Sequence, residues 1–455
     1  MKKRLNYRFF AEKFTKKVML LEFKIANFRS IGEEQVISLL PAPKQKDFPE
    51  NILLNGKQEA LNALAFYGAN ASGKSNLLLA MSHLDRLLHL SARFSSTTKL
   101  PYDPFLLRAG YEKKPTHFEI TFIADNRRYR FGLEFFEQEV SSEWLYRKEK
   151  GREVPLFLRE RDEVETFSSL KGNAKIVQAA IESTKPNGLF LSACDTFNLE
   201  DAKIIFKWFQ HFSVINALRT EDKMPETLSL WRDDAYRDKI EAFLLRLNLG
   251  FVGMEVQEKN FDANDLPVNM DEQMKAVISQ QLSGKKGFSV WAKHRMYDTD
   301  GKPTEQILSW KMGERESAGT NNMVQFSGPV LWTLLHGGVL IIDEIEAKKH
   351  PHLTLDLIDA FLKKETNPHG AQLIFSTHDS NLLTYSNLRR DQIYFVEKNH
   401  WESTEIYSLS DFRYLDGNGL KERPDRDKEK RYLEGRYGAV PVLKPQIVVF
   451  NGKEN

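Results

Sequence analysis

Several short segments of the chain alternate between apolar and polar residues, and this period of two is typical of half-buried β-strands. Near the N-terminus the pattern occurs twice in succession and predicts a hairpin, and between residues 116 and 148 it predicts three antiparallel strands. A last hairpin is expected shortly before residue 410. The alternating segments outside 116–148 are Leu21–Asn27, Glu34–Leu40, Phe288–Tyr297, Gln392–Glu397 and Thr404–Leu409.

Other apolar segments predict an α/β core. Short, mostly apolar runs at Ala60–Phe66, Val339–Ile342 and Gln372–Ser376 are typical of strands buried on both faces of a parallel sheet. Apolar residues at helical spacing predict helices at about Lys74–Ser91, Lys175–Ser183, Glu200–Phe212, Asp238–Leu247, Asn322–His336 and Leu353–Lys364. We therefore predict an α/β fold with a parallel core sheet, an antiparallel β subdomain and an inserted helical lid.

These changes of pattern suggest five parts. A basic N-terminal extension covers 1–18, an N-lobe of the core covers 19–149, and a mainly helical insertion covers 150–313. A C-lobe then covers 314–410, and a tail that could serve as a partner dock covers 411–455. The extension is either an unstructured leader, with Met19 as the usual start, or a basic arm that contacts nucleic acid or a partner.

Composition restricts the functional class. Of the 455 residues 41% are hydrophobic and 28% are charged, which is a soluble globular mixture. The 65 basic residues exceed the 63 acidic ones by only two, so a uniformly basic nucleic-acid-binding surface is not indicated. The single cysteine, Cys194, cannot form an intramolecular disulfide, and no apolar run approaches the ~20 residues that span a bilayer. We expect a cytoplasmic protein without a membrane partner.

The strongest motif is the segment Gly68–Ser75, which matches G-x-x-x-x-G-K-[ST] without a mismatch. Its glycines allow backbone N–H groups to face a phosphate, and the following helix adds its positive end. Lys74 would reach the β- and γ-phosphates, and Ser75 would help to hold Mg²⁺. No NKxD-type guanine-binding motif is present, so ATP is favoured over GTP. The predicted nucleotide-binding residues of this region are Gly68, Asn70, Gly73, Lys74, Ser75 and Asn76.

Two further segments supply acid–base groups. The run Val339–Ile342 ends in Asp343 and Glu344, so Asp343 would bind Mg²⁺ and Glu344 would orient or deprotonate the attacking water. His378 follows the next buried strand and would sense the γ-phosphate. Ligands bind at this end of the strands in open α/β sheets.

A second candidate phosphate site precedes the helix at Asn322–His336. Ser317, Gly319 and Thr320 can offer a hydroxyl, backbone N–H groups and a helix N-terminus to an anion. One P-loop cannot use two such sites at once. We therefore expect this segment to cover the nucleotide of a second subunit.

The order of these motifs resembles the ABC-type ATPase head shared by SMC proteins, RecF and OLD-family proteins, over residues from Met19 to about Leu409. The resemblance implies paired heads that sandwich two ATP molecules, with Asn27 and Arg29 near the nucleotide and Glu346 in the D-loop. Within that class, segments such as PYDPFLL, NGLFLSA, FSTHDSNLL and EGRYGAVP resemble AbiL/RloA-type abortive-infection ATPases of bacterial anti-phage systems. Thr320, Lys348 and Lys349 depart from the usual pattern, and Gln138 is the candidate for the Q-loop glutamine.

OLD proteins also carry a TOPRIM nuclease, for which the residues after Leu409 are too few. The resemblance therefore implies a separate effector, typically a TOPRIM-type nuclease encoded nearby, which the ATPase would control. The tail could dock that effector or cover the ATPase sheet. Two alternatives remain: an ATPase of DNA repair or recombination that acts directly on DNA, and a non-hydrolysing scaffold. The basic run Arg127–Arg130 suits a solvated sheet face or a DNA groove.

Overall fold

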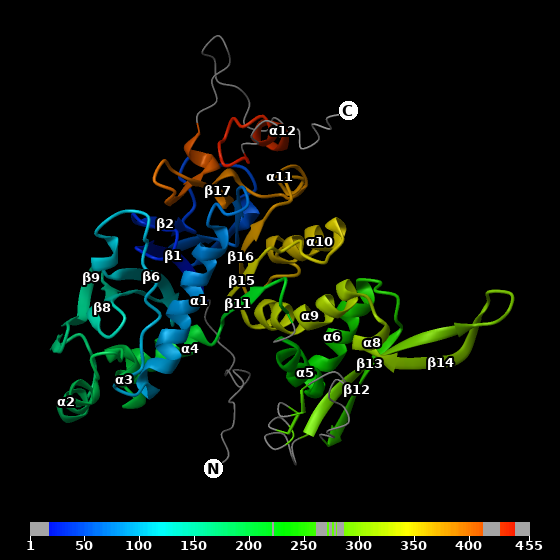
Figure 1. The fold of residues 1–455 in the computed structure, drawn as a ribbon, viewed down its shortest axis with the longest axis horizontal. Helices are drawn as coiled ribbons and strands as arrows, with labels where there is room; N and C mark the ends of the chain where they lie inside the picture. The colour runs from blue at the N-terminus through cyan, green and yellow to red at the C-terminus, as the bar shows by residue number, and fades with distance from the viewer. Residues whose placement is uncertain are drawn as a thin grey trace, which may run out of the picture. The chain divides into compact units, whose positions relative to one another are not determined.

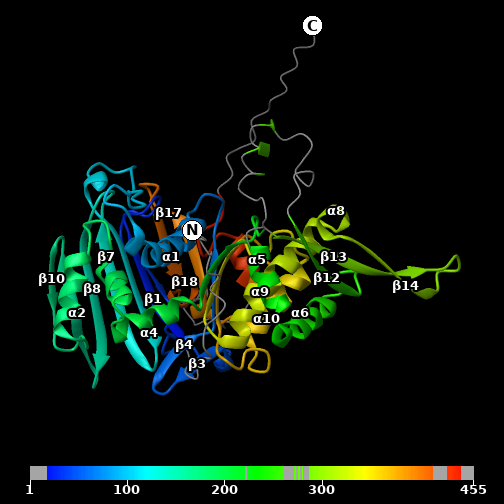
Figure 2. The same cartoon turned by 90° about the horizontal axis from the view of Figure 1, so that it is seen from below.

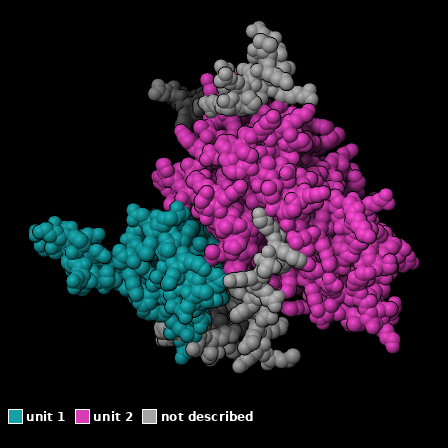
Figure 3. All heavy atoms as spheres, turned by 180° about the vertical axis from the view of Figure 1, so that it is seen from behind, with its two compact units in different colours: residues 1–9, 219–331 teal, residues 10–218, 332–455 magenta. Residues whose placement is uncertain are grey.

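The computed structural model describes residues 18–220, 223–260 and 286–412, the segment 428–441, and scattered positions between 271 and 279. The basic extension predicted at 1–18 lies outside these ranges except for Val18, and most of the predicted tail at 411–455 lies outside them as well. The chain divides into two compact units, coloured separately in Figure 3. One unit contains residues 10–218 and 332–455, and the other contains residues 219–331 with the first nine residues.

The larger unit contains an antiparallel sheet in the order β10-β9-β8-β7-β6-β1-β2, seen in Figure 2. The expected N-terminal hairpin (β1–β2) and the three strands expected within 116–148 (β6, β7 and β8) are confirmed. β9 and β10 continue this sheet within the range expected to be mainly helical. The strands are β1 Met19–Ala26, β2 Gln35–Ser38, β6 Thr116–Ala124, β7 Arg127–Phe135, β8 Val140–Glu149, β9 Arg152–Glu160 and β10 Glu163–Thr166.

A second sheet in the same unit has the order β11-β15-β16-β5-β17-β18 and is parallel except for β18. The predicted α/β fold with a parallel core and an antiparallel subdomain is thus confirmed. The helix expected at Glu200–Phe212 is too long, because α4 ends at Phe209 and β11 begins at Phe212. The strands are β5 Ala63–Tyr67, β11 Phe212–Asn216, β15 Val339–Asp343, β16 Gln372–Thr377, β17 Ile393–Lys398 and β18 Thr404–Ser408.

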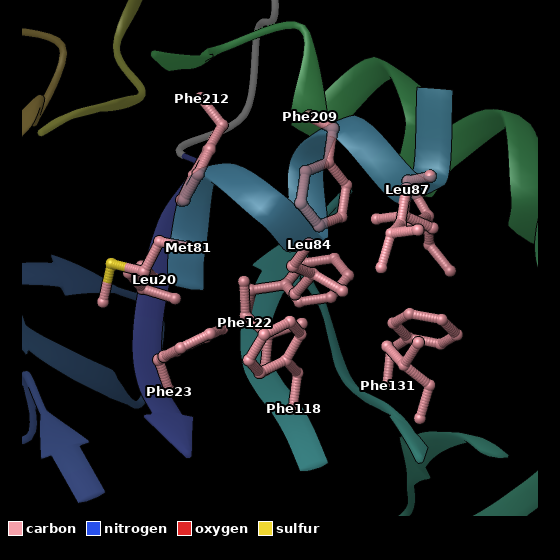
Figure 4. Close-up of a cluster of buried hydrophobic side chains, with 14 of the residues drawn as sticks. Leu20, Phe23, Met81, Leu84, Leu87, Phe118, Phe122, Phe131, Phe209 and Phe212 are labelled. Carbon is pink, nitrogen blue, oxygen red and sulfur yellow. The ribbon is translucent and has the colours of Figure 1, made fainter. Parts of the chain in front are cut away.

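Helix α1 (Lys74–Leu90) joins the two sheets through one hydrophobic cluster. Figure 4 shows Leu84 of α1 next to Phe122 of β6, and Met81 of α1 next to Leu20 of β1. Burial of such side chains contributes about 1.5–3 kcal/mol each, so α1 is held firmly behind the loop that precedes it. The remaining elements of this unit are β3 Ile52–Asn55, β4 Gln58–Leu61, α2 Ala174–Ser183, α3 Phe190–Thr196, α4 Glu200–Phe209, α10 Pro351–Leu362, α11 Leu382–Tyr385 and α12 Lys428–Leu433.

The smaller unit combines helices with a three-stranded antiparallel sheet in the order β12-β13-β14. It begins later than the insertion expected at 150, because residues 152–218 still pack with the larger unit. Its elements are α5 Met224–Arg232, α6 Asp234–Arg246, β12 Gly253–Asn260, β13 Lys286–Tyr297, β14 Pro303–Lys311 and α8 Met312–Arg315. Helix α9 (Ala318–His336) starts in this unit and ends in the larger one.

Within the described ranges, no helix has the length and apolar character that crossing a bilayer requires.

Candidate nucleotide-binding site

The segment Gly68–Ser75 forms a tight loop between β5 and α1. Ala71 and Gly73 adopt positive φ angles of 63° and 109°. A Cβ atom at Gly68 would lie 2.2 Å from the carbonyl oxygen of Val396, and one at Gly73 would lie 2.1 Å from Oγ1 of Thr404. The loop therefore needs both glycines, because atoms of β17 and β18 occupy the space that a side chain would need.

Lys74 is buried at the start of α1, while Asn70 and Ser75 are exposed. The Lys74 amine donates hydrogen bonds to the carbonyl oxygens of Gly68 at 2.7 Å and Ala69 at 2.9 Å. Burial lowers the pKa of Lys74 to about 8, although nearby acids, Asp343 first among them, oppose the shift. The amine thus lies within the loop and within electrostatic reach of the acids at and after the end of β15.

One hydroxyl group positions both predicted acids. β15 and β16 pair in parallel, and the Ser376 hydroxyl donates to Oδ1 of Asp343 at 2.5 Å. The same hydroxyl accepts a hydrogen bond from the backbone N–H of Glu344 at 2.8 Å. Glu344 has a positive φ of 56°, and burial, followed by the charge of Asp343, raises the pKa of its carboxyl. Ser376 was part of the recognised strand, but its role depends on a pairing that sequence spacing does not reveal.

His378 follows β16, which lies between the P-loop strand β5 and the strand β15 (Figure 1). Its backbone N–H donates to Oε1 of Glu346 at 2.7 Å. Partial burial lowers the pKa of His378, and the charge of Lys74 lowers it further. The structure therefore brings the distant segments that carry Lys74, Asp343, Glu344 and His378 to one end of the parallel sheet.

Arg29 lies beside the P-loop helix. Its guanidinium donates to Oδ1 of Asn76 at 3.1 Å and to Oδ2 of Asp103 at 3.0 Å. Asn27 has a different position: it is buried, and its amide donates to backbone carbonyl oxygens including those of Tyr111 and Lys114. Asn27 thus fixes a neighbouring loop, whereas Arg29 contacts a predicted nucleotide-binding residue.

Two hydroxyl residues that sequence reasoning missed connect this region to the loop. The amide of Asn76 donates to the Ser30 hydroxyl at 2.7 Å, and Ser30 pairs with the Thr404 hydroxyl at 2.8 Å. Thr404 in turn donates to the carbonyl oxygen of Ser72 at 2.8 Å. Serine and threonine are common throughout the chain, so no pattern around these two residues indicates their role.

Ser317, Gly319 and Thr320 lie at the start of α9, in the smaller unit. The exposed Ser317 caps the helix, because its hydroxyl oxygen accepts from the Thr320 backbone N–H at 3.0 Å. The preceding Glu316 accepts hydrogen bonds from His294 Nε2 at 2.8 Å and Trp310 Nε1 at 2.7 Å. The segment Glu316–Thr320 is thus anchored to the sheet β12-β13-β14.

A family model described as "AAA domain, putative AbiEii toxin, Type IV TA system" matches residues 64–171 and 329–384. The matched ranges contain the whole loop Gly68–Ser75, the acids Asp343 and Glu344, and His378. These two ranges of the chain therefore resemble an AAA domain. The matched ranges do not contain Arg29 or Ser317, and the roles of all the site residues stay predictions.

No curated protein matches the chain. Among solved structures, the SMC head domain from Thermotoga maritima is 14% identical, with a TM-score of 0.36 over 86% of this chain and 98% of that chain. The recombination mediator protein RecF of the RecFOR pathway is 12% identical, with a TM-score of 0.34 over 87% of this chain and 99% of that chain.

The donor groups at this candidate site fit Mg²⁺ that is held jointly with a nucleotide. In the part of the chain that the structure describes, no three His, Cys, Asp or Glu side chains form a ready metal cluster. Mg²⁺ usually binds through one or two carboxylates together with substrate phosphates. The Asp343 carboxylate and the exposed Ser75 hydroxyl match that donor set.

The structure describes the surroundings of Gln138, the candidate Q-loop residue, and of Lys348 and Lys349, which depart from the family pattern. Gln138 is exposed in the turn between β7 and β8. Lys348 has a positive φ of 59° and donates to the carbonyl oxygen of Leu218 at 2.9 Å. Burial lowers the pKa of Lys349 to about 7, with Glu346 opposing the shift. The roles of Gln138 in a Q-loop and of Glu346 in a D-loop stay predictions.

Proposed function

We propose that this ATPase domain binds ATP together with Mg²⁺ and hydrolyses it to ADP and phosphate. The observation that carries the proposal is the convergence of Lys74, the pair Asp343 and Glu344, and His378 at the carboxyl ends of β5, β15 and β16. A phosphate-binding loop, a carboxylate for the metal and a neighbouring base are the parts that phosphoryl transfer to water requires.

Each residue has a distinct task in this proposal. Backbone N–H groups of the loop bind the phosphates, and Lys74 exchanges its carbonyl partners for phosphate oxygens. Ser75 and Asp343 would hold Mg²⁺, which would neutralise charge that develops on the phosphates. Glu344 orients the attacking water and accepts its proton, and its raised pKa makes it a better base. His378 donates a hydrogen bond to the γ-phosphate.

The proposal includes a homodimer with two shared sites. The exposed Ser317 and the N-terminus of the 19-residue helix α9 would cover the nucleotide bound by the P-loop of the second subunit. Hydrolysis would then open the dimer, which is the switching step.

The biological role we propose is control of a separate effector, such as a TOPRIM-type nuclease encoded nearby, in cytoplasmic anti-phage defence by abortive infection. The matching family model, whose description refers to a toxin of a toxin–antitoxin system, supports a role of this kind. Direct action on DNA is less well supported, because two of the three arginines in the basic run on β7 are paired with acids. Arg130 pairs with Glu119 at 2.8 Å and Glu153 at 2.9 Å, and Arg127 lies 3.5 Å from Glu200.

The variant Glu344→Gln tests this function. It removes the base but keeps the size of the side chain, so we expect ATP turnover to fall about 10²–10⁴-fold while ATP binding persists. The measured quantities are phosphate release and the mass of the chain with and without ATP. Glu365→Gln, an exposed acid after α10, is the matched control.

We expect Glu344→Gln to accumulate as an ATP-bound dimer. Turnover equal to wild type would exclude Glu344 as the base, and a chain that stays monomeric with ATP would exclude the shared site. Repeating the assay with DNA and with the neighbouring gene product tests the biological role. DNA-stimulated turnover without a stable complex would favour the repair ATPase.

A further inference from the structure

The segment 428–441, which we call the C-terminal clasp, packs on the parallel sheet of the larger unit. It contains α12, which lies beside α11 and β17 in Figure 1. The ring of Tyr432 stacks on Phe395 of β17, with centroids 5.4 Å apart and planes at 16°. Tyr437 also stacks on Phe395, at 5.2 Å and 24°. Of the two roles expected for the tail, this part of it covers the sheet.

Hydrogen bonds fix the clasp in a defined position. The backbone N–H of Ala439 donates to Oε2 of Glu397 at 2.9 Å, and the Tyr407 hydroxyl donates to the carbonyl oxygen of Tyr437 at 2.7 Å. Gly438 has a φ of 66°, and a Cβ atom there would lie 2.5 Å from the Tyr407 hydroxyl. Because the contacts are this close, a shift of the clasp would also move the residues that it touches.

One acidic side chain of the clasp reaches the loop that carries His378. Oε1 of Glu429 accepts a hydrogen bond from the Ser380 hydroxyl at 2.9 Å, and Oε2 accepts from the Thr384 hydroxyl at 3.3 Å. The other end of this loop is held by Glu346, which accepts from the His378 N–H at 2.7 Å. Residues 378–384, a loop that continues into the start of α11, are therefore held by two carboxylates, one near each end.

The clasp also covers the end of the P-loop strand. Tyr67, the last residue of β5, is 1% exposed, and its ring lies 6.3 Å from that of Tyr432 at 66°. Its hydroxyl is buried with no hydrogen-bond partner among the described residues. The clasp thus contacts both elements that approach the γ-phosphate, the strand that leads into the P-loop and the loop after His378.

We propose that Glu429 is a positioning residue for ATP hydrolysis: by holding Ser380 and Thr384, it keeps the loop of His378 in the geometry that the γ-phosphate requires. The inference rests on the proposed function of the site. Because the ATP molecule is held chiefly by the P-loop, loss of this support affects turnover rather than binding. Anything that displaces the clasp would slow hydrolysis without removing the nucleotide.

The test measures ATP turnover by the full chain carrying Glu429→Ala. We expect kcat to fall about tenfold and KM for ATP to change by less than about twofold. Glu429→Gln should restore most of kcat, because its amide can accept from one hydroxyl and donate to the other. Glu434→Ala is the matched control, since Glu434 lies in the same segment and pairs with Arg436 at 2.7 Å.

A second variant keeps the test decisive if Glu429→Ala disturbs folding. Ser380→Ala combined with Thr384→Val removes the same hydrogen bonds from the other side and should give the same loss of kcat. Hydrogen exchange of residues 378–384 should be faster in both variants than in wild type. This second readout does not depend on activity.

The outcomes separate this inference from the proposed function. A wild-type chain without ATPase activity would refute the proposed function and the role of Glu429 in hydrolysis with it. Unchanged hydrogen exchange at 378–384 in Glu429→Ala would refute the role of Glu429 even in an active chain. An active wild type with unchanged kcat in Glu429→Ala would overturn only the role of Glu429. A rise of KM without a fall of kcat would overturn it too.

Discussion

Single side chains determine the electrostatic state of the candidate site. The Ser376 hydroxyl binds both Asp343 and the backbone of Glu344, so two negative groups are held close together. The positive charge nearby is that of Lys74, whose pKa burial lowers to about 8. A lysine whose pKa is lowered to about 8 changes its charge within reach of physiological pH.

The pH dependence of ATP binding follows from Lys74. The phosphates of ATP favour the protonated amine and raise its pKa, so binding takes up a proton when the free protein is above pH 8. We expect the affinity for ATP to be constant below about pH 7 and to weaken as pH rises through about 8. Calorimetry in buffers of different ionisation enthalpy measures both affinity and proton uptake.

The control for this prediction is Lys74→Ala, which should bind ATP more weakly and without this pH dependence. If the wild-type affinity is the same at pH 7 and pH 9.5, Lys74 does not carry its charge to the phosphates.

At the scale of elements, helix α9 contains a proline and is still continuous. Pro329 lacks a backbone N–H, so the carbonyl oxygen of Gln325, four residues earlier, loses its helical partner. The buried Thr227 of α5 replaces it, because its hydroxyl donates to that oxygen at 2.9 Å. The same hydroxyl accepts from the N–H of Gly328 at 3.1 Å. α5 therefore completes the hydrogen bonding of α9.

Thr227→Val keeps the shape of this side chain and leaves the Gln325 carbonyl unsatisfied. We expect a cost of about 1–3 kcal/mol in the local stability of α9. Hydrogen exchange of peptides from α9 measures it. The control is Thr304→Val, whose hydroxyl bonds the carbonyl oxygen of Met296 at 2.9 Å in an exposed hairpin, where water can take its place. Equal effects of the two substitutions would contradict the argument.

Sequence patterns predicted the elements with a clear period or a contiguous motif. The strands β1, β2, β6, β7 and β8 alternate, and the loop Gly68–Ser75 matches its motif residue by residue. β11 was missed because Trp208, Phe209 and Phe212 continue the apolar character of α4 across its end. Ser30 and Thr404 were missed because their contact joins residues 374 positions apart, and no local pattern encodes such a pairing.

At the scale of the whole molecule, helix α9 connects the two candidate phosphate sites. It begins after Ser317 in the smaller unit and ends at His336, three residues before β15, the strand that ends in Asp343. In the proposed dimer, α9 of one subunit covers the nucleotide bound by the second subunit. The same helix leads into β15, whose Asp343 would serve the nucleotide bound by its own subunit. Each site then depends on both subunits.

Mixing two inactive variants tests this dependence. Lys74→Ala removes the P-loop lysine, and Ser317→Arg blocks the covering segment with a bulky side chain, so each variant alone should have little activity. A heterodimer keeps one intact site, and an equal mixture should recover about a quarter of wild-type turnover, since half of the dimers are mixed. Phosphate release from the mixture measures the recovery. Full activity of Ser317→Arg alone, or no recovery on mixing, would contradict the shared site.

The close contact of the P-loop with β17 and β18 has a consequence for folding during synthesis. Gly68 and Gly73 lie directly against residues of β17 and β18, and Thr404 binds the backbone of the loop at Ser72. A ribosome adds about 5–20 residues per second, so the loop leaves it many seconds before β18 exists. A nascent chain therefore lacks the support that shapes its phosphate site until synthesis has passed Thr404. In the proposed function, nucleotide binding then reports that nearly the whole domain has been synthesised and folded.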